Sequence, residues 1–185
     1  ERHHRKMVSR KGFSLLVYCR SNKYLKEEIR MNREEVTLTK FVVVGISVRT
    51  TNQNHQSQED IAKLWEVFFR NAYIQQLMPN KVSNDIYCIY TDYESDYTGE
   101  YTTVLGYKVS SIEGIPTNLG LTFKEIPESK YYKYLSEGEL PYAIGKTWAH
   151  IWQSNIKRRY LADFDIYGEE SKDPKNTKIT TYLSI

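Results

Sequence analysis

One order of predicted elements occurs twice along this chain, and such a repeat limits the possible folds more than any other feature of the sequence. The first copy begins with residues 37–50, a largely apolar run rich in β-branched residues, as expected for a strand buried on both faces. A helix follows, because apolar residues recur on one helical face at Ile61, Leu64, Trp65, Phe68, Phe69 and Ala72. Residues 57–60 indicate a capping box, and we expect the helix to end near Leu77, before Pro79. Strands at residues 85–90 and 101–109 complete a β-α-β-β unit.

The second copy has the same order. A long strand interrupted at Pro127 is predicted over residues 121–126 and 131–135, and a helix entered through Pro141 carries an apolar stripe ending at Trp152. Two closing strands are predicted at residues 163–167 and 177–185. The copies also share short echoes, such as Lys63-Leu64-Trp65 with Lys146-Thr147-Trp148, and Ile89-Tyr90 with Ile166-Tyr167. Two βαββ repeats predict an α+β fold with pseudo-twofold symmetry, an antiparallel sheet, two main helices and a cleft where the halves meet.

Composition fits one globular domain and excludes several classes of protein. The chain has 185 residues, of which 40% are hydrophobic and 14% aromatic, enough for a sizeable core. No stretch approaches the roughly 20 apolar residues of a membrane helix, so we expect a cytoplasmic protein without a membrane partner. Cys19 and Cys88 lack the spacing of a disulfide framework or a thiolate zinc site, and we predict no metal and no cofactor.

The net charge of the chain differs in sign before and after residue 30. Residues 1–30 hold nine basic and three acidic residues, so the remainder carries a net charge of −3. We interpret residues 1–30 as a basic N-terminal extension, which need not be native to the protein, with a nucleic-acid-binding tail as the alternative. Residues 31–185 are predicted to form the domain, and their acidic balance argues against direct nucleic-acid binding. Lys157, Arg158 and Arg159 are expected to be cations after the second helix, where they suit the helix dipole.

Aromatic residues are the first candidates for a binding site. Tyrosine combines an electron-rich face with a hydroxyl group, which suits a flat, hydrophobic or cationic ligand, and the sequence has 16 of them. Four lie on strands or at a helix entrance beside the predicted cleft: Tyr107, Tyr142, Tyr167 and Tyr182. Tyr93, Tyr97 and Tyr160 lie beside turns or charges and are expected to be ordinary surface residues.

Asp165 is the acidic candidate. It lies between Phe164 and Ile166 in a predicted strand, at the position that Cys88 holds in the first copy. Alternation places its side chain on the same face as Asp163 and Tyr167. A buried carboxylate in this setting attracts cations, whereas the alternative is an outward polar residue on a half-exposed strand.

Enzyme motifs are weak. The sequence has no Gly-x-Ser-x-Gly, no Walker loop, no Gly-x-Gly-x-x-Gly and no His-Glu-x-x-His. His150, beside Trp148 on the second helix, is interpreted as a packed or surface histidine.

Three segments of the second half carry a family resemblance: residues 126–138, Trp148-x-x-Ile151-Trp152, and Asp163-Phe-Asp-Ile-Tyr167. The chain from about residue 36 onward resembles the GyrI-like effector-binding domains of multidrug-responsive transcription activators, which also occur as stand-alone proteins. The resemblance implies two βαββ repeats around a cleft for hydrophobic, often cationic compounds, with an acidic residue at its floor. That residue is commonly Glu, and Asp165 holds the position here. The family's regulators usually carry a DNA-binding domain, which residues 1–30 are too short to supply.

The resulting hypothesis is a stand-alone effector-binding domain, monomeric or weakly dimeric, that binds an amphipathic or cationic small molecule. Asp165 supplies the anion, Tyr167 flanks the cleft, and five residues form its walls: Trp148, Trp152, Tyr107, Tyr142 and Tyr182. Three alternatives stay open. One is a hydrolase on the same scaffold with Asp165 or Glu125 as base, the second is a protein-interaction module like the gyrase inhibitors, and the third is haem binding as in the related SOUL domain.

Overall fold

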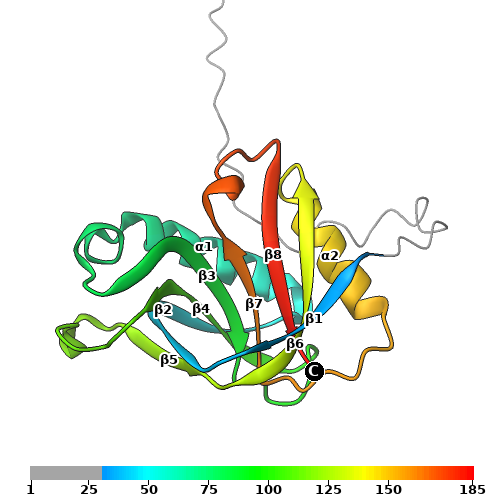
Figure 1. The fold of residues 1–185 in the computed structure, drawn as a ribbon, viewed down its shortest axis with the longest axis horizontal. Helices are drawn as coiled ribbons and strands as arrows, with labels where there is room; N and C mark the ends of the chain where they lie inside the picture. The colour runs from blue at the N-terminus through cyan, green and yellow to red at the C-terminus, as the bar shows by residue number, and fades with distance from the viewer. Residues whose placement is uncertain (1–30) are drawn as a thin grey trace, which may run out of the picture.

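An eight-stranded antiparallel sheet, strongly curled, forms the body of the molecule in the computed structural model, which describes residues 31–185 (Figure 1). The predicted N-terminal extension lies outside the described residues. The strands are β1 (Arg33–Leu38), β2 (Phe41–Thr51), β3 (Lys81–Thr91), β4 (Glu100–Val109), β5 (Thr122–Ile126), β6 (Ser129–Gly138), β7 (Ala162–Tyr167) and β8 (Thr177–Ser184). The two main helices are α1 (Gln56–Arg70) and α2 (Tyr142–Gln153).

The strand order confirms the predicted duplication. The sheet runs β1-β6-β8-β7-β3-β4-β2-β5, which reads the same from either end once β2-α1-β3-β4 and β6-α2-β7-β8 are taken as equivalent units. The two units meet where β7 pairs with β3. The fold is therefore α+β with antiparallel pairing and internal pseudo-twofold symmetry, as predicted.

The curl of the sheet comes from two long strands that are each broken once. Residues 37–50 were predicted as one strand, but the chain bends at Thr39 and Lys40 between β1 and β2. The equivalent bend, at Pro127, separates β5 from β6 as predicted. Because β1 pairs with β6 while β2 pairs with β5, each long strand joins one half of the sheet to the other.

Helix α1 differs from its prediction at both ends. The capping box is wrong: Ser57 lies inside the helix and donates a hydrogen bond to Asn52 Oδ1, while Asp60 accepts one from Thr50. The helix ends at Arg70 rather than near Leu77. Asn71 is extended and its side chain accepts the amide hydrogen of Ile74, so residues 73–77 form a separate π-helical turn.

Both helices cover the same face of the sheet. Buried residues of α1 such as Phe68 and of α2 such as Trp148 belong to one core cluster with Leu105 and Ile179 of the sheet. The opposite face of the strands has a second core, which the curled sheet encloses: Val43, Ile89, Val104, Ile126, Tyr131, Ala162 and Phe164. The cleft predicted between the halves can form only on the helical side.

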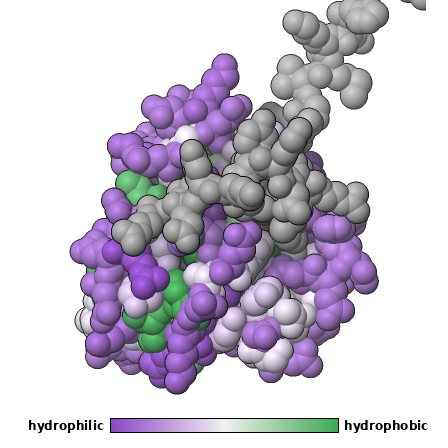
Figure 2. Space-filling view, turned by 90° about the vertical axis from the view of Figure 1, so that its right-hand side faces the viewer, coloured by the Kyte–Doolittle hydropathy of each residue, from purple (hydrophilic) through white to green (hydrophobic). Residues whose placement is uncertain are grey.

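Most of the large apolar side chains in residues 31–185 are buried or half-buried, and nine are exposed: Val67, Phe69, Leu77, Val82, Ile112, Leu119, Leu135, Tyr142 and Leu161. No helix in residues 31–185 is both long and apolar enough to cross a membrane. The side of the molecule shown in Figure 2 is largely hydrophilic where its residues are described, with a small hydrophobic area.

Candidate functional site

A cleft opens between α1 and α2, above the strands at the centre of the sheet. Both halves of the chain contribute to it, and aromatic rings make up most of its wall. The lining residues are Asn52, Ser57, Gln58, Ile61, Trp65, Tyr90, Tyr93, Tyr97, Tyr101, Pro141, Ile144, Trp148, Trp152, Arg158 and Tyr167. All three tryptophans of the sequence are among them.

Two tryptophan–tyrosine pairs form the deep part of the cleft. Trp148 of α2 meets Tyr90 of β3 edge-on at 5.3 Å between ring centroids, and Trp65 of α1 meets Tyr167 of β7 edge-on at 5.1 Å. Each pair joins a helix of one repeat to a strand of the other. Because the two pairs are equivalent under the pseudo-twofold symmetry, the duplication has produced two similar aromatic walls facing one cleft.

Asp165 lies directly beneath one of these walls and is fully buried. Its Oδ2 accepts hydrogen bonds from the hydroxyl of Tyr90 at 2.9 Å and from the indole Nε1 of Trp148 at 3.1 Å. Its Oδ1 accepts a hydrogen bond from Thr181 at 2.5 Å. Burial raises the pKa of this carboxyl from 3.8 to about 6, while the three hydrogen bonds act in the opposite direction. A carboxylate with this pKa is mostly ionised at neutral pH.

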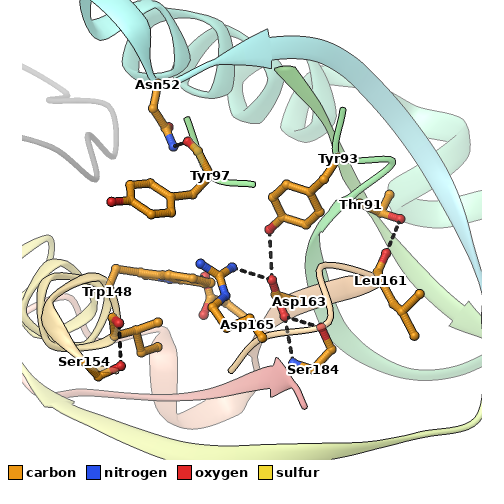
Figure 3. A network of polar contacts seen from close by, with 12 residues as sticks. Asn52, Thr91, Tyr93, Tyr97, Trp148, Ser154, Leu161, Asp163, Asp165 and Ser184 are labelled. Carbon is orange, nitrogen blue, oxygen red and sulfur yellow. Dashed lines mark hydrogen bonds and ion pairs between the residues drawn. The ribbon is translucent and has the colours of Figure 1, made fainter. Parts of the chain in front are cut away.

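A second buried carboxylate, Asp163, is held by an ion pair. The guanidinium of Arg158 donates to Asp163 Oδ2 at 2.6 Å, and the side chains of Arg158 and Asp163 are 4% and 0% exposed. Tyr93 donates to the same oxygen from one side, while the backbone and hydroxyl of Ser184 donate to Oδ1 from the other (Figure 3). This carboxylate is neutralised by Arg158, so Asp165 contributes the uncompensated charge beneath the cleft.

The rim of the cleft is formed by partly exposed side chains. Trp152 is half-buried and stacks on Tyr97 with ring centroids 6.1 Å apart. Asn52 fixes this rim, because its amide donates to the carbonyl of Tyr97 and its Oδ1 accepts hydrogen bonds from Ser57 and Tyr101.

The structure brings four of the seven residues predicted for the site together. Trp148, Trp152 and Tyr167 line the cleft, and Asp165 contacts the lining residues Trp148 and Tyr90 from below. Asp165 faces the same side as Asp163 and Tyr167, as the alternation predicted. It does not point outward, as the alternative assumed.

Three predicted wall residues lie outside the lining. Tyr182 pairs in register with Phe164 and stacks on it at 4.9 Å, which places it in the core on the opposite face of the sheet. Tyr107 is buried under α1 and donates a hydrogen bond to Gln75. Tyr142 is the first residue of α2 and 55% exposed.

Several lining residues were not predicted. Trp65 was named only as part of the apolar face of the first helix, and Tyr90 only in a predicted strand. The echoes between the two copies could have identified Trp65 as the counterpart of Trp148 and Tyr90 as the counterpart of Tyr167. Tyr93 and Tyr97 were expected to be ordinary surface tyrosines, but both line the cleft. Arg158 was expected to be a cation that suits the dipole at the end of the second helix, but α2 ends at Gln153, and the following irregular segment carries Arg158 into the buried ion pair.

The residues named for other chemistry lie elsewhere. Glu125, the second base considered for a hydrolase, lies on β5 and forms an exposed ion pair with Lys40. His150 packs edge-on against Tyr134, with ring centroids 6.2 Å apart. Within the described part of the chain, no three His, Cys, Asp or Glu side chains are grouped so that they could hold a metal ion.

Comparison with known proteins identifies the family. The chain belongs to the Cass2 family of integron-associated effector-binding proteins, whose family model matches residues 36–185. It is 24% identical to the putative transcriptional regulator YobU of Bacillus subtilis over 147 residues, covering 76% of this chain and 89% of YobU. The resemblance to GyrI-like effector-binding domains is thereby confirmed.

Solved structures share the fold. The integron cassette protein from the mobile metagenome of Vibrio cholerae is 25% identical, with a TM-score of 0.62 over 82% of this chain and 94% of that protein. SAV2435, solved bound to tetraphenylphosphonium, has a TM-score of 0.66 at 16% identity over 83% of this chain and 93% of its own. The C-terminal domain of EcmrR has a TM-score of 0.54 at 9% identity, covering 84% of this chain and 98% of that domain.

Proposed function

We propose that this domain binds hydrophobic cationic small molecules in the aromatic cleft, in a sensing, regulatory or sequestering role. The observation that carries the proposal is the buried carboxylate of Asp165 directly behind two rings that line the cleft. Tyr90 and Trp148 both line the cleft and both donate hydrogen bonds to the anion below. A cation over an aromatic face is stabilised by about 0.5 to 2 kcal/mol, and a nearby carboxylate in a partly desolvated site adds to this.

The charges around the cleft support the same ligand class. Arg158 is the cation in the lining, and its charge is balanced by Asp163 at 2.6 Å. The net charge around the cleft is therefore negative whenever Asp165 is ionised. That SAV2435, a protein of the same fold, was solved with tetraphenylphosphonium supports a ligand that is both aromatic and positively charged.

A pair of probes with equal shape and opposite charge tests this proposal. Tetraphenylphosphonium and tetraphenylborate are titrated into the protein, and intrinsic fluorescence reports on the cleft because all three tryptophans line it. We expect the cation to bind at least roughly tenfold more tightly than the anion at pH 7.5. Equal affinities, or no binding of the cation, would contradict the proposal.

Substitution of Asp165 tests whether the buried carboxylate causes the preference for the cation. Asp165→Asn keeps the size of the side chain and removes its charge, so the cation should lose about tenfold in affinity while the anion gains. Asp173→Asn, in the exposed turn before β8, is the matched control and should leave both affinities unchanged.

A further inference from the structure

Arg158 has one buried donor atom without a hydrogen-bond partner in the described part of the chain. Its Nη2 bonds Asp163, but its Nε is buried and has no hydrogen-bond partner in the described part of the chain. Buried polar groups are nearly always hydrogen-bonded, and leaving one unpaired costs about 1 to 3 kcal/mol. The orphan Nε–H therefore indicates a missing acceptor.

The position of this donor points to the cleft as the source of that acceptor. Arg158 is one of the lining residues, and its guanidinium is fixed on several sides. It lies 4.2 Å from the ring centroid of Tyr160 and about 6 Å from those of Tyr93 and Trp148. With the ion pair to Asp163 on another side, the donor has little freedom to turn elsewhere and is pre-organised for a molecule in the cleft.

Electrostatics selects the kind of acceptor. The guanidinium charge is already balanced by Asp163, and Asp165 lies beneath the neighbouring Trp148. A carboxylate or phosphate on the ligand would gain a hydrogen bond from Nε but would be repelled by Asp165. A neutral carbonyl, amide or sulfonyl oxygen gains the bond without that repulsion.

We infer that Arg158 Nε is a specificity-determining contact, and that the ligands of this cleft are aromatic cations that also carry a neutral hydrogen-bond acceptor. This inference rests on the proposed function, since it adds a second recognition element to the same cleft. It separates two kinds of lipophilic cation. Cations without an acceptor contact only the aromatic walls, whereas cations with an acceptor also receive a hydrogen bond from Arg158 Nε.

Two phosphonium ions that differ in one group test the inference. Triphenylphosphonium carrying a 4-acetylphenyl group has a carbonyl oxygen, and the 4-isopropylphenyl analogue replaces it with a methyl group of similar size. We expect the wild-type protein to bind the acetyl compound about tenfold more tightly. Arg158→Lys keeps the positive charge beside Asp163 but lacks the Nε–H, so this preference should disappear. Arg159→Lys, at the adjacent arginine that bonds Ser129, should retain it.

A measurement on the wild-type protein avoids dependence on the folding of the variant. In a ¹⁵N–¹H NMR spectrum, the acetyl compound should shift the Nε–H signal of Arg158 downfield more than the isopropyl compound does. If neither compound binds, the proposed function fails. If both bind equally, or if Arg158→Lys keeps the preference, the function stands and the inference about Arg158 is overturned.

Discussion

Cys88 and Asp165 face each other across the ladder between β3 and β7, and they are also equivalent positions of the two repeats. The pseudo-twofold axis therefore passes between them. Cys88 donates a hydrogen bond to the Tyr90 hydroxyl at 3.3 Å, and Tyr90 in turn donates to Asp165. Because burial first and the nearby Asp165 second raise the pKa of Cys88, the thiol stays neutral.

The consequence is a cleft with symmetric walls and an asymmetric floor. Both repeats supply a tryptophan–tyrosine pair, but only one of the two equivalent floor positions is acidic. The uncompensated negative charge of Asp165 is placed below the Tyr90–Trp148 pair. A bound cation is thus expected on that side of the cleft.

The buried carboxylate should make stability depend on pH in an unusual direction. The pKa of Asp165 is raised to about 6 in the folded state, so between pH 4 and 6 the folded protein binds more protons than the unfolded chain. The contribution of this group to the free energy of unfolding is therefore greatest below pH 4. It falls by roughly 2 to 3 kcal/mol as pH rises through 6.

Asp165→Asn should remove this penalty. An asparagine oxygen can accept from Tyr90 and Trp148, while its amide donates to the Thr181 hydroxyl. We expect the variant to match the wild-type protein near pH 4.5 and to melt roughly 5 to 10 °C higher at pH 7.5. Thermal unfolding of both proteins across this range checks it, with Asp173→Asn as control. A difference that does not change with pH would contradict the assignment.

Much of this arrangement could be predicted from the sequence, because the repeated order of elements is a local signal. Apolar periodicity located both helices, and strand alternation put Asp165 and Tyr167 on one face. Tyr182 was misplaced because its face depends on cross-strand register with Phe164, which no local pattern encodes.

Other features depended on long-range structure. Pairing of β1 with β6 and of β2 with β5 follows from the curl of the whole sheet. Arg158 lies in an irregular segment without periodicity, and its three neighbouring rings come together only in the folded protein. Its burial could not have been predicted from the run of basic residues, which is typical of a solvated surface.

The hydrogen bond from Trp148 to Asp165 should set the pH at which cations bind. Affinity for tetraphenylphosphonium should rise with pH through about 6, as Asp165 ionises. Trp148→Phe removes a donor that favours the charged carboxylate, so the midpoint should move to higher pH by about one unit. Fluorescence titrations with tetraphenylphosphonium over pH 5 to 8 measure this midpoint. Trp65→Phe, the pseudo-symmetric control, changes a ring of the other pair and should leave the midpoint in place.

The domain boundary gives a separate prediction. β1 begins at Arg33 and the family match begins at residue 36, so residues 31–185 should contain the elements needed for folding. A chain beginning at Met31 is expected to unfold within a few degrees of the 185-residue protein. A fall on the order of 10 °C, corresponding to more than about 2 kcal/mol, would show that residues 1–30 stabilise the domain.

Trp152 and Tyr142 lie on the same helix and offer a test of which aromatic residues form the wall. Trp152 lines the cleft and stacks on Tyr97, whereas Tyr142 is 55% exposed and lies outside the lining. Trp152→Ala should weaken tetraphenylphosphonium and tetraphenylborate alike by about 1 to 2 kcal/mol, since it removes contact area that both ions use. Because Trp152 is only half-buried, the thermal midpoint should change little. Tyr142→Ala should leave both affinities unchanged in isothermal titration calorimetry. If Tyr142→Ala lowered the affinity as much as Trp152→Ala, the ligand would extend beyond the cleft described above.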